Sequence, residues 1–329
     1  MARFPASARQ CEVGAVGSAV GRTAQVRKTQ ALDDDETPGD TGSVPELPEV
    51  HALTTDLSAR LRGRTIERLD IVAFAALKTY DPPVTALSGM TISGVTRHGK
   101  FLDIAADDLH IVIHLARAGW IRWRENTPQR AARGGKTALA AQLVLDDGSG
   151  FDITEAGSKK SLSISVVRNP VDVPGVARLG PDPLDETFTL ETFTDILRSA
   201  GRAQIKGVLR NQSIIAGIGN AYSDEILHTA RMSPFKPATL TDEEVARLFE
   251  ALQFTLRNAL DRADGLTASE LKKEKKSGLQ VHGRTGEPCP VCGDMVRQVI
   301  FSDTTFQYCP TCQTGGKVLA DRVLSRLLK

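Results

Sequence analysis

The chain contains few aromatic residues, few cysteines and no long apolar segment. Aromatic residues make up 5% of its 329 positions, and there are five cysteines. An odd number of cysteines without a secretion signal argues against a disulfide framework. No apolar run reaches the roughly 18 residues that a membrane-spanning helix needs. We therefore expect a cytoplasmic protein without a membrane partner.

The net charge of the chain is small, but an excess of positive residues lies at one end. The formal net charge is only +1, which alone does not favour a protein that binds nucleic acid. Residues 271–329, however, carry ten lysines and arginines against five acidic residues. Such a local excess is typical of a surface that binds phosphate, although an ordinary solvated surface gives the same count.

The first 44 residues show no sustained apolar pattern. They are rich in small and polar residues, and their acidic run 33–36 does not fit a transit peptide. We expect residues 1–44 to be a disordered extension that arises from a mis-assigned start, because a GUG codon encodes valine internally but can initiate translation as methionine. The chain would then begin at Val44, and loss of that residue would expose Pro45. A genuine disordered tail is the alternative.

Pro45 has two interpretations. At a chain terminus, proline is a secondary amine that is partly unprotonated at neutral pH. Such an amine attacks an aldehyde-level carbon and forms an iminium, as lysine does in Schiff bases. The simpler interpretation is a helix start, with Pro48 in an early helical position and Glu49 in the first turn.

Four of the cysteines form two pairs with the spacing of metal ligands. Cys289 and Cys292 make one pair, and Cys309 and Cys312 make the second after sixteen intervening residues. Between the pairs, residues 297–308 alternate and include strand formers, as a hairpin does. This spacing is typical of four thiolates that bind one structural zinc ion and so fold a short ribbon.

The middle of the chain changes from a strand pattern to a helix pattern. An amphipathic helical stripe covers residues 50–61. Strand-like segments follow at 66–72, 100–105, 110–123, 139–145, 151–154 and 162–167, and they predict a mainly antiparallel sheet domain. Four prolines and two glycines in 168–183 predict a linker. Helical patterns return at 188–200, 203–210, 220–232 and 241–263, the last with a capping box of Thr241 and Glu244.

A glycine-containing turn, Ser213–Asn220, lies between two of these predicted helices. Gly217 and Gly219 let the backbone approach a phosphate closely. Asn220 is expected to cap the next helix, whose free N–H groups would face the anion. An ordinary turn between packed helices is the alternative interpretation.

Four motifs, in chain order, resemble those of the formamidopyrimidine-DNA glycosylase and endonuclease VIII family of base-excision repair enzymes. They are the catalytic motif Pro45–Val50, the lysine motif Arg97–Leu102, the helix–two-turns–helix element Gln212–Glu225 and the zinc finger Gly286–Gln313. The resemblance covers residues 45–329 and implies an α+β multidomain fold. Its parts would be a catalytic two-layered β-sandwich with flanking helices (45–170), a helical DNA-binding helix–two-turns–helix domain (184–280) and a β-hairpin zinc finger (281–329).

The resemblance also implies the chemistry of a DNA glycosylase with abasic-site lyase activity. The amine of Pro45 would attack C1′ of a flipped-out damaged nucleotide, displace the base and leave a Schiff base with the DNA. Glu46 would deliver protons near the sugar ring oxygen, and Lys100 would contact phosphate and assist β-elimination. From the residues alone, Lys100 is equally well a surface lysine. The residues implied to bind the phosphates beside the lesion are Lys206, Gly219 and Asn220.

Three departures from the family pattern leave the lesion unspecified. Thr304 stands where the family's finger carries an arginine credited with δ-elimination. Arg117 stands where the family inserts a methionine into the gap left by the flipped base, and Arg117, Trp120 and Trp123 are candidates for that DNA-contacting wedge. The lesion-covering loop is shortened to the basic stretch 272–276, so a preference for oxidised purines is not carried over.

We therefore expect an enzyme that removes damaged, oxidised bases from double-stranded DNA and nicks the strand. It would act as a monomer at the nucleoid and hold one structural zinc ion. The alternative is a damaged-DNA or DNA-structure binding protein of the same fold with lost or altered catalysis. Pro45, Glu46 and Lys100 favour catalysis, whereas the altered wedge, loop and finger residues favour a changed substrate. A zinc-ribbon interaction module accounts only for about the last fifty residues.

Overall fold

Two four-stranded sheets form the first part of the computed structural model, which describes residues 44–128, 138–157, 159–301 and 304–320, without the side chains of Phe301 and Thr304. The predicted extension 1–44 lies outside the described residues except for Val44. One sheet has the order β1, β6, β7, β5 and the other the order β2, β3, β4, β8. All neighbouring strands are antiparallel, as predicted. The strands are β1 (Ile66–Ile71), β2 (Ile92–His98), β3 (Phe101–Ala106), β4 (Leu109–His114), β5 (Gly119–Arg124), β6 (Leu139–Leu145), β7 (Gly150–Glu155) and β8 (Ser163–Val167).

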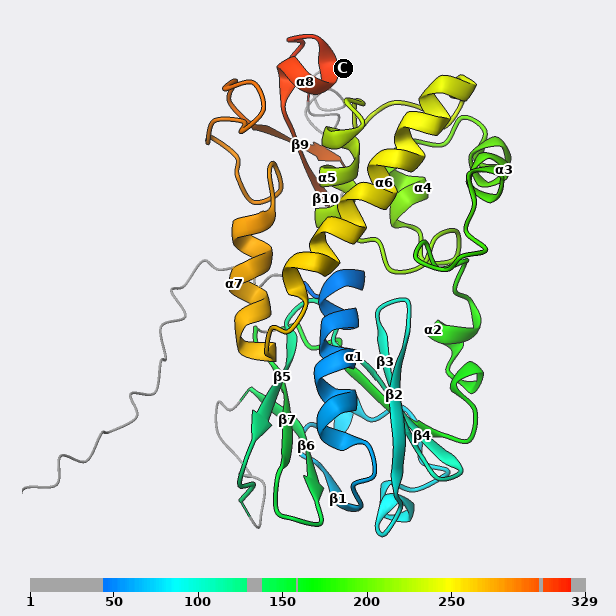
Figure 1. Ribbon diagram of the computed structural model, residues 1–329, viewed down its shortest axis with the longest axis vertical. Coiled ribbons are helices and arrows are strands. Elements are labelled where there is room, and N and C mark those ends of the chain that lie inside the picture. Colours follow the sequence, from blue (N-terminus) through cyan, green and yellow to red (C-terminus); the bar gives the residue numbers. More distant parts are fainter. Residues whose placement is uncertain (1–43, 129–137, 158, 302–303, 321–329) are drawn as a thin grey trace, which may run out of the picture. The chain divides into compact units, whose positions relative to one another are not determined.

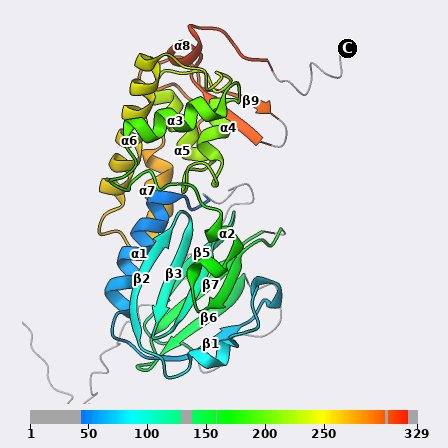
Figure 2. The same ribbon diagram turned by 90° about the vertical axis from the view of Figure 1, so that its right-hand side faces the viewer.

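One apolar core joins both sheets and the first helix. Helix α1 (Leu47–Leu61) buries Val50, Leu53, Leu57 and Leu61, which is the helical stripe predicted from the sequence. These residues share a core with alternate residues of both sheets, and α1 runs along β2 (Figure 1 and Figure 2). Two short 3-10 helices, η1 (Phe74–Ala76) and η2 (Val84–Leu87), connect β1 to β2. The result is the β-sandwich with a flanking helix that the family resemblance implies.

The predicted single strand 110–123 is wrong. It is two strands, β4 and β5, which belong to different sheets. A tight turn separates them, in which Ala116 adopts a left-handed φ of 55° and Gly119 N–H donates to Leu115 O at 2.8 Å. Nothing in the alternating composition of this stretch marks the turn. Strand β2 was also not among the predicted strands.

The predicted linker is not extended. It contains η3 (Pro170–Asp172) and α2 (Pro174–Ala177), which pack on the sandwich through Val173 and Val176. A Cβ on Gly175 would lie 2.5 Å from the ring of Phe101, so glycine allows this close packing.

The predicted helices follow and enclose a second core. They are α3 (Leu190–Ala200), α4 (Ile205–Arg210), α5 (Asn220–Thr229) and α6 (Asp242–Ala263). The capping box of Thr241 and Glu244 that opens α6 is confirmed. Among the described residues, no helix is long and apolar enough to cross a membrane.

The basic stretch that the sequence placed in a loop is helical instead. Helix α7 (Ala268–Gly278) opens with a capping box of Thr267 and Glu270 and packs against α1, α6 and β5. The predicted hairpin follows as β9 (Arg297–Phe301) and β10 (Thr304–Tyr308), ending in α8 (Pro310–Thr314).

Candidate active site and metal centre

The N-terminus of α1 is closed by its own side chains. Glu46 precedes the helix, and its backbone N–H donates to Glu49 Oε2 at 2.8 Å. Pro48 lies in an early helical position, so the predicted helix start is confirmed. Pro45 is buried directly before this capping arrangement.

The carboxylate of Glu46 binds the N-terminus of α5. Its oxygens accept hydrogen bonds from the backbone N–H groups of Gly219 at 2.5 Å, Ala221 at 2.9 Å and Tyr222 at 3.3 Å. The anion at the N-terminus of this helix is a side chain of the protein, whereas the sequence predicts a phosphate there. A Cβ on residue 219 would lie 2.3 Å from Glu46 Cδ, so only glycine fits there.

Opposing effects act on the pKa of Glu46. Burial raises this pKa, whereas the charges of Lys275 and Lys100 and the N–H of Ala221 lower it, and it ends below its usual value. Glu46 is therefore a carboxylate at neutral pH. Of the roughly four lone-pair positions of a carboxylate, three accept N–H groups, which leaves about one to accept a proton.

The turn before α5 is held in shape by one side chain. Gln212 accepts from Gly217 N–H at 2.9 Å and donates to Ile218 O at 2.6 Å. Gly217 has a φ of 87°, and its carbonyl accepts from Leu47 N–H at 3.0 Å. The turn thus joins α1 and α5 through backbone as well as through Glu46.

Asn220 does not cap α5, contrary to prediction. It is the first residue of the helix, and Gly219 is the cap residue. The Asn220 amide donates to Thr305 O at 3.0 Å, which fixes the finger hairpin beside the active site. Its Oδ1 atom is buried without a partner among the described residues, so it is available to a donor from outside the chain.

Lys275 from α7 reaches the start of α1. Its ammonium donates to Glu49 Oε2 at 2.7 Å and to the carbonyl oxygen of Val44 at 2.8 Å. It also lies 4.9 Å from the centre of the Tyr222 ring, whose hydroxyl donates to Glu49 Oε1 at 2.7 Å. Lys275 is 2% exposed, so this is a buried ion pair within the active site.

Lys100 lies in the two-residue turn between β2 and β3, rather than on a strand. Burial lowers the pKa of its ammonium, and the charge of Lys275 adds to this, whereas Glu46 opposes it. Lys100 and Glu46 therefore interact through their charges. Gly99 makes the turn with a φ of 54°.

Lys206 is enclosed rather than exposed. Its ammonium forms an ion pair with Asp224 and lies 4.1 Å from the centre of the Phe306 ring. The second oxygen of Asp224 contacts His282 Nδ1 at 2.8 Å. Lys206 therefore joins α4, α5 and the finger hairpin, a position that sequence reasoning did not foresee for a phosphate contact.

The candidate wedge residues lie in different environments. Arg117 is exposed in the turn between β4 and β5. Trp120 is buried and donates to Ala268 O at 2.8 Å, which makes it a packing residue between β5 and α7. Trp123 is half-buried against Arg60, whose guanidinium lies 4.8 Å from the ring centre. Thr304 begins β10, and its side chain lies outside the described part of the chain.

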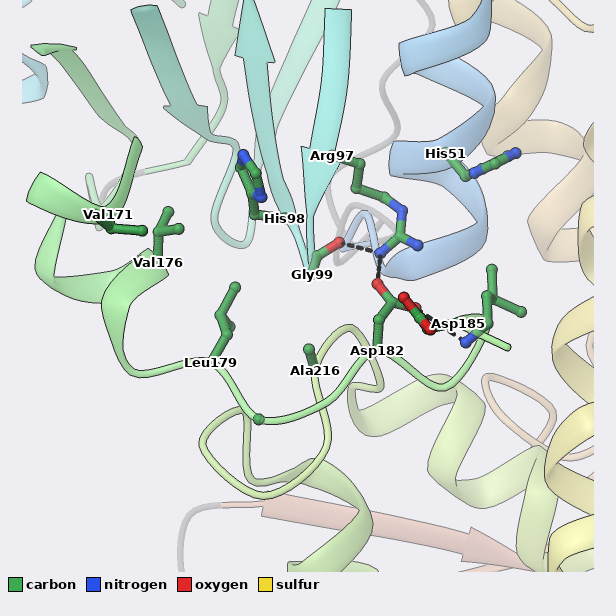
Figure 3. Close-up of a pocket in the computed structure, with 12 residues that line it drawn as sticks. His51, Arg97, His98, Gly99, Val171, Val176, Leu179, Asp182, Asp185 and Ala216 are labelled. Atoms are coloured by element: carbon green, nitrogen blue, oxygen red, sulfur yellow. Dashed lines mark hydrogen bonds and ion pairs between the residues drawn. The ribbon is translucent and has the colours of Figure 1, made fainter. Parts of the chain in front are cut away.

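A cavity of about 600 Å³ adjoins the site (Figure 3). Arg97 crosses it to pair with Asp182 at 2.7 Å, which joins β2 to the segment after α2. Gly99 and Ala216 line the cavity, but Pro45, Glu46 and Lys100 do not. The cavity is therefore a neighbour of the site rather than its centre.

The four predicted zinc ligands converge. Thiolates about 2.3 Å from a tetrahedral zinc ion stand about 3.8 Å from one another. The Sγ atoms of Cys289 and Cys312 are 3.9 Å apart, and those of Cys292 and Cys309 are 3.3 Å apart. His228 was not predicted, yet its Nε2 lies 3.3 Å from Cys289 Sγ. His228, Cys289, Cys309 and Cys312 form a group that could hold a metal ion.

Comparisons with known proteins agree with this geometry. A model of the formamidopyrimidine-DNA glycosylase N-terminal domain matches residues 44–156, and one of the formamidopyrimidine-DNA glycosylase H2TH domain matches residues 179–270. An uncharacterized formamidopyrimidine-DNA glycosylase-like protein of Mycobacterium tuberculosis is 55% identical over 152 residues, which is 46% of this chain and 94% of that protein.

Two further relatives match over most of the chain. The formamidopyrimidine-DNA glycosylase of Heliobacterium modesticaldum is 33% identical over 284 residues, which is 82% of this chain and 100% of that protein. The solved complex between Lactococcus lactis Fpg and DNA containing an abasic site has a TM-score of 0.71 at 26% identity and covers 82% of this chain and 99% of that one. The chain belongs to the formamidopyrimidine-DNA glycosylase family.

Proposed function

We propose that this protein is a base-excision DNA glycosylase that also cleaves the abasic site, with the amine of Pro45 as nucleophile. One observation carries the proposal: Glu46 holds the residue-45 end of α1 against the N-terminus of α5, with Lys100 beside it. Family membership and the Lactococcus lactis relative solved with DNA containing an abasic site support damaged DNA as the partner. We propose that this DNA is double-stranded and that the enzyme acts as a monomer.

In the proposed reaction, the nitrogen lone pair of Pro45 attacks C1′ of the flipped-out nucleotide, and the base leaves with the electrons of the glycosidic bond. Glu46 begins as a carboxylate, so it takes the proton that the attacking amine releases and passes it to the sugar ring oxygen. The ring opens and an iminium joins Pro45 to C1′. Lys100, whose pKa is lowered by burial, assists β-elimination of the strand as an amine base.

The contacts to DNA are proposed from the same motifs. Asn220 would bind a phosphate beside the lesion through its amide nitrogen once the contact with Thr305 O opens. Gly219, whose N–H already donates to Glu46, would let the backbone approach that phosphate. The unpartnered Oδ1 of Asn220 would accept from a donor that binding brings in. Arg117 would enter the gap left by the flipped base. Lys206 would reach a phosphate only if its ion pair with Asp224 opens. We therefore propose that Lys206 supports the site by holding Asp224 of α5 and Phe306 of the finger hairpin. One zinc ion would be held by Cys289, Cys292, Cys309 and Cys312.

A second function, damage binding without catalysis, is favoured for the 329-residue form by one observation. Residue 44 acylates the Pro45 nitrogen, and its carbonyl accepts from Lys275 at 2.8 Å. An acylated proline nitrogen is not a nucleophile.

Borohydride trapping on DNA that contains an abasic site tests both functions. Protein processed to begin at Pro45 should form a covalent adduct, whereas the 329-residue form should bind the same DNA and form none. Equal trapping by the two forms would rule out Pro45 as the nucleophile.

A further inference from the structure

Lys275 is a charged residue of the site that the proposed chemistry does not yet use. It comes from α7, more than 220 residues after the start of α1, and is 2% exposed. A buried ammonium is retained only where partners offset its desolvation. Here the partners are Glu49 Oε2 at 2.7 Å, the carbonyl of Val44 at 2.8 Å and the face of Tyr222 at 4.9 Å.

The contact with residue 44 places Lys275 beside the reacting nitrogen. The carbonyl carbon of residue 44 is bonded to both its oxygen and the nitrogen of Pro45. With bond lengths of about 1.2 and 1.3 Å, the ammonium of Lys275 therefore lies within about 5 Å of that nitrogen. When residue 44 is removed, the ammonium loses this acceptor, and the nitrogen of Pro45 becomes a terminal amine.

Several charged groups of both signs surround this position. The carboxylate of Glu46 accepts hydrogen bonds from N–H groups of α5. The carboxylate of Glu49 accepts from Lys275, from the hydroxyl of Tyr222 and from the backbone N–H of Glu46. The N-terminal end of α1, which carries partial positive charge, also faces residue 45. The titratable groups that interact here are Glu46, Glu49, Lys100, Lys206, Arg210, Tyr222, Asp224, Glu274 and His282.

We propose that Lys275 is a positioning residue of the reaction, whose ammonium keeps the terminal nitrogen of Pro45 unprotonated and therefore nucleophilic at neutral pH. The inference rests on the proposed function, because it requires Pro45 to be the nucleophile. A positive charge beside an amine disfavours its protonated form. At about 5 Å and an effective dielectric constant of about 20, the charge of Lys275 alone would lower the pKa of the amine by about two units, and the opposing charge of Glu49 leaves about one.

A purely structural clamp between α1 and α7 is the competing role for Lys275. The two roles differ in their pH dependence. Loss of a clamp lowers activity by a similar factor at every pH, whereas loss of a charge that acts on the amine moves the pH at which activity rises.

The test uses protein that begins at Pro45, with a neutral and a charged replacement of Lys275. Lys275→Met keeps the length of the side chain without its charge, and Lys275→Gln is a second neutral variant that still donates to Glu49. Lys275→Arg retains the charge. Lys78→Met is the control, since Lys78 is an exposed lysine outside the elements that form the site. The readout is the rate of borohydride trapping on abasic DNA from about pH 5.5 to 9.5.

A second readout does not depend on DNA. The rate at which formaldehyde and cyanoborohydride methylate the Pro45 amine is followed by mass spectrometry of the N-terminal peptide over the same pH range. This arm keeps the inference testable when a variant binds DNA poorly.

For both neutral variants we expect the midpoint of each pH profile to rise by about one unit, with about tenfold slower trapping near pH 6.5 and little change near pH 9. Lys275→Arg and Lys78→Met should keep the parent profile. Unshifted midpoints in Lys275→Met and Lys275→Gln would overturn the inference while leaving Pro45 as nucleophile. Absence of trapping by the parent protein would instead reject the proposed function itself.

Discussion

Replacing Gly219 with alanine should break the contact between Glu46 and α5. The new Cβ would lie 2.3 Å from Glu46 Cδ and 2.5 Å from its Oε1, so the carboxylate must leave the helix N-terminus. Three hydrogen bonds to a charged group are then lost, each worth about 1.5–3 kcal/mol net of the exchange with water. The displaced carboxylate can make new hydrogen bonds, so we expect the free energy of unfolding to fall by about 3 kcal/mol, which is below the sum of the three.

Activity should fall with the same contact. A displacement of Glu46 that costs the transition state about 3–4 kcal/mol corresponds to a loss of about 10²–10³ in rate. The assay is single-turnover base excision from duplex DNA with an oxidised base, by protein that begins at Pro45, together with urea unfolding of the same samples.

Gly207→Ala is the matched control. A Cβ at Gly207, within α4, meets no atom within 4 Å, so alanine should leave activity unchanged and raise stability by about 0.5–1 kcal/mol. If Gly219→Ala keeps the parent rate, as Gly207→Ala should, and also loses no stability, Glu46 does not act from the N-terminus of α5.

Three further predictions follow from the finger, the charges and Glu46. Chelation of the metal, or Cys289→Ser, should weaken duplex binding but leave the near-UV circular dichroism of the sandwich tryptophans intact, because the ribbon folds locally; substoichiometric zinc in freshly purified protein would contradict the metal site. Duplex affinity measured by fluorescence anisotropy should fall by about 10³ between about 50 and 200 mM salt, and Asn220→Ala should weaken binding to all sequences alike; salt-independent affinity would refute this. Because the pKa of Glu46 is lowered on folding, its carboxylate stabilises the fold at neutral pH, and this stability is lost as pH falls through the folded-state pKa. Glu46→Gln should therefore reduce the fall of Tm below about pH 5, and an unchanged dependence of Tm on pH in this range would count against the buried carboxylate. The same variant should retain more abasic-site cleavage than base excision.

The parts of the fold that are set by local sequence could be predicted. The start of α1 at Leu47, with Pro48 in its first turn, and the capping box at Thr241 depend on residues within one turn of the chain. The two cysteine pairs and the hairpin between them could likewise be predicted from the spacing of the cysteines along the chain. These features appear in the structure because no tertiary contact competes with them.

The parts that depend on distant contacts could not be predicted. The turn that separates β4 from β5 carries no proline and places Ala116, not a glycine, at a positive φ, so the alternating pattern hides it. Lys206 looks like a solvent-facing lysine until α5 supplies Asp224 eighteen residues later. Lys275 and His228 are recognised only once the fold brings them to Glu49 and Cys289, because no spacing rule links residues so far apart in the chain.

The most direct test of the account is to locate the residue that carries the DNA. Protein processed to begin at Pro45 is trapped with borohydride on DNA containing an abasic site, digested with protease and nuclease, and sequenced by tandem mass spectrometry. The account predicts that the deoxyribose remnant is attached to the nitrogen of Pro45 in the N-terminal peptide. Attachment to the side chain of Lys100 or Lys275, with an unmodified Pro45, would contradict it.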